Sequence, residues 1–102
     1  MPCAYLIVES QITDPEAFKR YMAAAPEAVK AFGGAYLVRG GRTQVLEGDW
    51  QPPRLTMLRY PSFDAARAMY DSPAYVYARS LREGTTACFN MVLVEGVETA
   101  PI

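Results

Sequence analysis

The chain of 102 residues carries 10 Lys and Arg against 11 Asp and Glu, a net charge of -1, and 51% of its residues are hydrophobic. This length predicts one domain, residues 1–102, and the apolar content excludes a disordered protein. The balanced charge favours neither nucleic acid nor an anionic membrane surface, and no stretch approaches the roughly 18 apolar residues of a membrane helix or resembles a secretory signal. We therefore expect a cytoplasmic protein without a nucleic-acid or membrane partner.

The sequence contains no histidine and two cysteines, Cys3 and Cys88. Without histidine, the usual general base and the commonest zinc and iron ligand are missing, so we expect no metal and no cofactor. Any catalysis would have to use carboxylate, tyrosine, arginine or the substrate itself. Each cysteine begins an apolar run, and because these two runs are predicted to be antiparallel, the thiols should lie at opposite ends and remain free.

Six elements are predicted in the order strand, helix, strand, strand, helix, strand. The strands are apolar on both faces, and the helices show apolar residues at the helical period. In chain order the elements are a strand at 4–8, a helix from 14 or 15 to 32, strands at 35–38 and 55–60, a helix from 63 toward 84, and a strand at 86–94. This order is typical of the ferredoxin-like α+β sandwich, in which two helices cover one face of a four-stranded antiparallel sheet.

Prolines and capping residues divide the two helices. Thr13 and Asp14 are alternative caps for the first helix, and Pro26 should kink it or make it restart. In the second helix, Ser72-Pro73 predicts a break and a new start, with the serine as cap and the proline in the first turn.

Two helices can cover only one face of the sheet, yet the strands are apolar on both faces. The open face must therefore be buried by something, and a second copy of the chain is the simplest candidate. We expect a homodimer whose sheets pack face to face, with an ordinary interface of about 800 Å² per partner.

The segment after the second strand concentrates unusual chemistry. Gly40-Gly41 marks a bend, from which residues 43–46 should continue in extended form. Arg39, just before the bend, could clamp a ligand carboxylate or form an ion pair with Glu47. Glu47 and Asp49 point the same way in an extended segment, a pattern that suits a general acid or base but is also ordinary in a solvated loop.

Aromatic residues supply the other candidates for a site. Trp50 could form the wall of an apolar pocket, or cover the sheet edge or the dimer seam. Tyr70, Tyr75 and Arg79 surround the break in the second helix, where Tyr75 and Arg79 are neighbours one turn apart. A phenol beside an arginine suits proton transfer, although packing is the commoner role. Glu9, if it faces the helices, would be a semi-buried carboxylate near Arg39 or Arg59.

Several segments distributed over nearly the whole chain resemble one known family. They include Thr13-Asp14-Pro15-Glu16-Ala17, Tyr36-Leu37-Val38-Arg39-Gly40-Gly41, Leu46-Glu47-Gly48-Asp49-Trp50 and Tyr70-Asp71-Ser72-Pro73-Ala74-Tyr75. Through them the chain resembles the domain-of-unknown-function 1330 family of the dimeric α+β barrel superfamily. The resemblance implies a ferredoxin-like dimer, and the superfamily includes small oxygenases, isomerases, lyases and heme-degrading proteins. It implies no particular reaction.

These observations lead to two functional hypotheses. The first is a homodimer that holds a small organic acid or aromatic molecule between sheet and helices, as a metal-free enzyme or enzyme-like protein. The second is a non-catalytic dimeric module that binds a metabolite or a protein partner. Convergence of Arg39 and Trp50 on an enclosed pocket with a semi-buried acid would favour the first. The candidates are Glu47, Asp49 and Tyr75 for catalysis, and Arg39, Trp50, Tyr70 and Arg79 for ligand binding.

Overall fold

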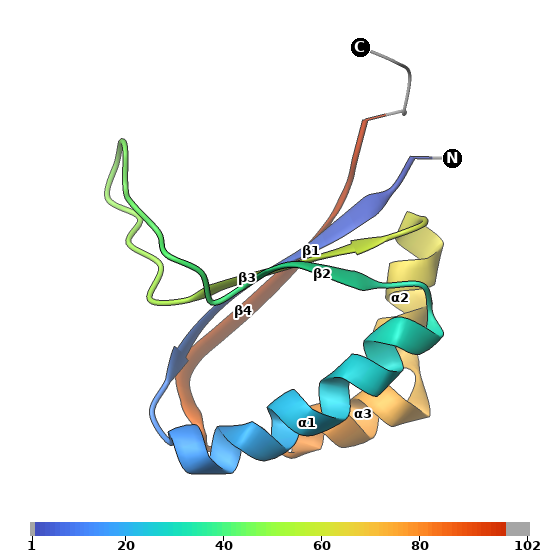
Figure 1. The fold of residues 1–102 in the computed structure, drawn as a ribbon, viewed down its shortest axis with the longest axis horizontal. Coiled ribbons are helices and arrows are strands. Elements are labelled where there is room, and N and C mark those ends of the chain that lie inside the picture. The colour runs from blue at the N-terminus through green and yellow to red at the C-terminus, as the bar shows by residue number, and fades with distance from the viewer. Residues whose placement is uncertain (1, 98–102) are drawn as a thin grey trace.

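A four-stranded antiparallel sheet carries three helices on one face in the computed structural model, which describes residues 2–97 (Figure 1). The strand order is β2-β3-β1-β4. In chain order the elements are β1 (Ala4–Ile12), α1 (Pro15–Ala31), β2 (Ala35–Arg39), β3 (Leu55–Tyr60), α2 (Phe63–Asp71), α3 (Pro73–Ser80) and β4 (Thr86–Glu95). The predicted ferredoxin-like α+β fold is confirmed.

Side-chain caps start each helix. The Asp14 carboxylate accepts a hydrogen bond from the Ala17 amide at 3.1 Å, so Asp14 is the cap of α1. Ser62 caps α2 in the same way, and Ser72 separates α2 from α3 and accepts from the Tyr75 amide at 3.2 Å. These starts agree with the sequence. The restart expected at Pro26 does not occur, because α1 continues through it.

The core lies between the sheet and the helices. Alternate residues of β1, Ala4, Leu6 and Val8, are buried on the helix side, as the period of a strand requires. Leu6 and Val8 belong to a buried cluster that includes, from the helices and the other strands, Ala25, Ala28, Val29, Leu58, Tyr60, Ala66, Met69, Tyr75 and Ala78.

The opposite face of the sheet carries a row of apolar side chains. Ile7 of β1 pairs with Met57 of β3 on one side and with Val92 of β4 on the other. The side chain of Val92 is 60% exposed. No element of the described chain covers this face (Figure 1), so the apolar surface that suggested a partner is present.

Residues 40–54, between β2 and β3, form a long exposed loop that extends away from the sheet (Figure 1). The extended strand expected at 43–46 is not formed. Both cysteines are free, as predicted, and lie toward opposite ends of the sheet. None of the helices within residues 2–97 is long and apolar enough to cross a membrane.

Candidate functional site

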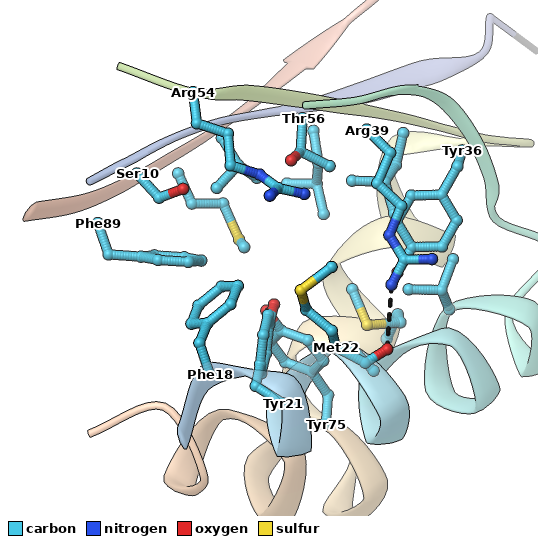
Figure 2. A pocket seen from close by; sticks show the side chains of 17 residues that line it. Ser10, Phe18, Tyr21, Met22, Tyr36, Arg39, Arg54, Thr56, Tyr75 and Phe89 are labelled. Carbon is cyan, nitrogen blue, oxygen red and sulfur yellow. Dashed lines mark hydrogen bonds between the residues drawn. The ribbon is translucent and has the colours of Figure 1, made fainter. Parts of the chain in front are cut away.

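A cavity of about 40 Å³ lies between the sheet and α1, lined by 17 residues (Figure 2). The cavity is partly open to solvent, so a ligand that enters it can extend beyond this volume. Most of the lining is aliphatic, aromatic or sulfur-containing. The polar side chains in it are those of Ser10, Tyr21, Tyr36, Arg39, Arg54, Thr56 and Tyr75. An apolar cavity with a few convergent polar groups is the usual form of a small-molecule site.

Two arginines enter this cavity from the sheet. Arg39 ends β2, and Arg54 immediately precedes β3. Gly40 follows Arg39 in the chain and lies against the Arg54 side chain. Its φ is +71°, and a Cβ built on it would lie 3.0 Å from the Arg54 guanidinium carbon. The left-handed backbone favours glycine at this position, and a larger residue would also displace the Arg54 guanidinium by a few tenths of an ångström.

Arg39 is held in place by an irregularity of α1. Its Nη2 donates a hydrogen bond to the Met22 carbonyl at 3.0 Å, and its guanidinium lies 4.6 Å from the centre of the Tyr36 ring. In a regular helix the Met22 carbonyl would accept from the amide of residue 26. Residue 26 is proline and has no N–H, so this carbonyl is free for the arginine.

The helix side of the cavity holds a pair of phenols. The hydroxyl oxygens of Tyr21 and Tyr75 are 2.6 Å apart, and Arg82 Nη1 lies 3.3 Å from the Tyr75 oxygen (Figure 2 draws the two tyrosines). The Arg82 guanidinium also stacks 3.8 Å from the centre of the Phe89 ring. Burial, followed by the proximity of Tyr75, raises the pKa of Tyr21 well above its ordinary value, so Tyr21 stays a neutral phenol and a hydrogen-bond donor.

Burial likewise raises the pKa of Tyr36, and the charge of Arg39 opposes the shift. Tyr36 therefore remains a neutral ring on which the guanidinium can rest. No Asp or Glu of the described residues lines the cavity. The polar surface is thus made of cations and hydroxyls, which suits a ligand carrying negative charge.

Of the residues selected from the sequence, Arg39 and Tyr75 both line the cavity. Tyr70 and Arg79 do not. The Arg79 guanidinium stacks 4.3 Å from the centre of the Tyr70 ring, and Tyr70 packs against Tyr75 with ring centres 5.7 Å apart. Tyr70 and Arg79 therefore lie behind the lining residue Tyr75 and do not form the surface of the cavity.

The carboxylate pair and the tryptophan lie elsewhere. Glu47, Asp49 and Trp50 are exposed in the loop 40–54, outside the cavity. Trp50 Nε1 donates to Glu9 at 3.1 Å, and the Asn90 amide donates to the same carboxylate at 3.1 Å.

Glu9 alternates with the buried residues of β1, so it points to the open face, and the condition for its lying near Arg39 or Arg59 on the helix side is not met. Arg39 and Trp50 consequently belong to opposite faces of the sheet. The alternative ion pair of Arg39 with Glu47 is replaced by the hydrogen bond to Met22.

Several polar residues of the cavity region are not among the candidates predicted from the sequence, and Tyr21, Arg54 and Arg82 are the most important of them. Tyr21 sits in the apolar stripe of α1 and looks like ordinary core, Arg54 follows two prolines, and Arg82 falls in the turn after α3. A tyrosine within an apolar stripe is the one local signal that could have pointed to a buried hydroxyl. Within residues 2–97, no group of three Cys, Asp or Glu side chains could hold a metal ion.

Comparison with known structures agrees with an α+β protein of ferredoxin-like architecture. Residues 3–97 match the family described as Domain of unknown function (DUF1330), and the chain belongs to this family. No curated protein matches the chain in sequence.

Three solved structures illustrate the fold. RPA0582, a protein of unknown function from Rhodopseudomonas palustris, is 16% identical with a TM-score of 0.76, over 95% of this chain and 84% of that one. A dimeric ferredoxin-like protein of unknown function from Thermobifida fusca is 16% identical with a TM-score of 0.61, over 92% and 91%. SnoaB, a cofactor-independent oxygenase from Streptomyces nogalater, is 11% identical with a TM-score of 0.60, over 100% of both chains. At these identities the likeness is one of fold.

Proposed function

We propose that the protein is a homodimer that binds a small organic acid, aliphatic or aromatic, in the cavity between the sheet and the helices. The observation that carries this proposal is the entry of Arg39 and Arg54 into a mostly apolar cavity that no Asp or Glu of the described residues lines. A guanidinium can bind a carboxylate through two parallel hydrogen bonds, and the apolar walls would hold the rest of the molecule.

Self-association is supported by the open face of the sheet. Ile7, Met57 and Val92 form an apolar row there, and a second sheet packed on it would remove the row from water. Structural neighbours are described as dimeric. Sedimentation at micromolar concentration should give a dimer, and Val92→Glu should give a folded monomer. A wild-type monomer with an intact circular dichroism spectrum would refute this part of the proposal.

Whether the bound acid is converted depends on groups that can move a proton. Tyr75 lines the cavity and is the catalytic candidate best placed to act there. A metal-free reaction would be in keeping with SnoaB, which is described as a cofactor-independent oxygenase. Glu47 and Asp49, exposed in the loop 40–54, could act only on a ligand that reaches this loop, for example in the site of the dimer partner.

A binding module without turnover is the second candidate. It is favoured by the same composition of the cavity, since neither carboxylate nor histidine among the described residues is present there to serve as a general base. In that case Arg39 and Arg54 would still bind the acid, and no product would form on prolonged incubation.

The test compares acids with neutral analogues of the same shape. Benzoate should raise the melting temperature and benzamide should not, because only the carboxylate can pair with the guanidinium groups. Arg39→Met and Arg54→Met should each weaken the effect of benzoate, and Arg42→Met, in the exposed loop, should not. If a panel of small carboxylates stabilises wild type no better than the matching amides, the proposed function is wrong.

A further inference from the structure

Ser10 is a buried polar residue at a position where the pattern of β1 calls for an apolar one. It continues the row of Leu6 and Val8 on the helix side of the strand. Only 2% of the residue is exposed, it lines the cavity, and its hydroxyl forms no hydrogen bond with the described residues. Burying a hydroxyl without a partner is unfavourable, and a group bound in the cavity would supply the partner.

The pairing of the strands brings Ser10 beside two other polar side chains. The Ser10 amide donates to the Arg54 carbonyl at 3.0 Å, which continues the β1–β3 pairing by one residue and makes the two residues opposite neighbours. Thr56 follows two positions after Arg54, and its partner Val8 also belongs to the helix side. Opposite residues of antiparallel strands share a face, with Cβ atoms about 4.5–5.5 Å apart. The three polar side chains therefore enter the same part of the cavity from the sheet (Figure 2).

The two arginines of the cavity differ in how many of their donors are in use. Arg39 donates to the Met22 carbonyl and rests on the Tyr36 ring. The Arg54 side chain forms neither a hydrogen bond nor an ion pair with the described residues, although it lies in the cavity. Arg39 is paired with Thr56 across β2 and β3, so it adds a second positive charge next to the same group.

We propose that Arg54, Ser10 and Thr56 form the carboxylate subsite of the cavity, and that Arg39 assists from its edge. A carboxylate has about four lone-pair sites, and one guanidinium can occupy two of them through parallel hydrogen bonds. The two hydroxyls supply the remaining two donors. Only the head group of the acid lies in this subsite, and the rest can extend through the open side of the cavity. This inference rests on the proposed function and assigns Ser10 and Thr56 as binding residues.

Two variants that remove a hydroxyl with little change of shape test the subsite by calorimetric titration of benzoate. Ser10→Ala and Thr56→Val should each weaken binding about tenfold, the effect of one hydrogen bond to a charged group. Neither should lower the urea midpoint of the free protein, because neither hydroxyl has a partner to lose among the described residues. Arg54→Met should weaken benzoate binding more than Arg39→Met.

The matched controls remove the same groups elsewhere. Ser80, at the end of α3, and Thr43, in the loop 40–54, are both exposed and outside the cavity. Ser80→Ala and Thr43→Val should bind benzoate as wild type does.

Failure of this inference is distinguishable from failure of the proposed function. If benzoate binds through Arg54 but both hydroxyl variants bind it as tightly as wild type, the hydroxyls do not belong to the subsite, and the acid site stands without them. A loss of affinity matched by an equal loss of stability would show that Ser10 and Thr56 act through the fold, which also contradicts the assignment. A larger effect of Arg39→Met than of Arg54→Met would move the carboxylate to Arg39. If no acid binds at all, the acid site itself is wrong and this inference falls with it.

Discussion

Replacing Pro26 with alanine should make the protein more stable and its acid site weaker. Pro26 lies inside α1 and lacks the amide hydrogen that would bond the Met22 carbonyl. That carbonyl instead accepts from Arg39 Nη2 at 3.0 Å. Alanine would supply the missing amide and complete the helix, and the new bond would compete with the one that holds Arg39 over the cavity.

The two effects can be estimated separately. Proline in a helix interior is about 3 kcal/mol less favourable than alanine. Part of this gain is lost with the bond to the exposed Arg39 side chain and with the packing of the proline ring, so we expect a net stabilisation of about 1–2 kcal/mol. For a domain of this size that is a rise in melting temperature of roughly 4–16 °C. Release of Arg39 should weaken binding of benzoate about twofold to tenfold.

The assay combines urea unfolding, followed by circular dichroism, with calorimetric titration of benzoate. Pro15→Ala is the matched control, since Pro15 occupies the first turn of the same helix, where the absent amide has no intrahelical partner to lose. It should change neither quantity appreciably. If Pro26→Ala increases stability but leaves benzoate affinity intact, the Met22 carbonyl does not position Arg39. If it destabilises the protein, the reasoning about α1 is wrong.

Three further predictions concern the core and its tyrosines. A Cβ at Gly34 would lie 2.6 Å from the Tyr60 ring, so Gly34→Ala should destabilise the protein by about 1–3 kcal/mol in urea unfolding. The control is Gly41→Ala, because a Cβ at Gly41 would meet its nearest atom at 3.9 Å. Its free energy of unfolding should stay within about 0.5 kcal/mol of wild type. Tyr60→Phe should be neutral or stabilise by about 1 kcal/mol, because the buried Tyr60 hydroxyl has no partner among the described residues; a loss of more than 1 kcal/mol would reveal one. Burial raises the pKa of Tyr21, Tyr36 and Tyr60, so in the unfolded chain these phenols ionise first, near pH 10. The contribution of the neutral phenols to stability is complete below that pH and is lost as the pH rises above it. The urea concentration at the midpoint of unfolding should therefore stay constant between pH 7 and 9 and fall beyond pH 10. An unchanged midpoint at pH 11 would contradict the burial of these groups.

Local signals predicted the fold well because they act within a few residues. Asp14, Ser62 and Ser72 each bond an amide three positions ahead, so the sequence alone places the starts of α1, α2 and α3. The loop was predicted less well: residues 43–46 were expected to continue in extended form, yet no neighbouring strand is available to pair with them. Backbone groups without a partner strand remain in water, and the segment stays irregular.

The candidate site was only partly accessible from the sequence. Arg39 and Tyr75 were selected for their residue types and lie in the cavity. Tyr21 and Arg82 are separated from each other by the whole of β2, β3, α2 and α3, and nothing near either of them in the chain indicates a hydrogen-bond chain. Arg82 reaches Tyr75 from the turn after α3, and only the packing of α1 beside α3 brings Tyr21 to them.

By itself, then, the sequence determined the order of strands and helices, their starts, and the presence of an apolar second face on the sheet, because periodicity and capping are short-range properties. The tertiary structure decided which polar groups share a cavity. Side chains alternate between the two faces along β1, so Glu9 and its hydrogen-bond partner Trp50 lie at the open face of the sheet. Arg39, in contrast, faces α1. In the sequence, Pro26 suggests a break in a helix. In the folded chain, its missing amide hydrogen leaves the Met22 carbonyl free to accept from Arg39. The sequence does not show this bond, because the carbonyl of α1 and the arginine of β2 meet only in the tertiary structure.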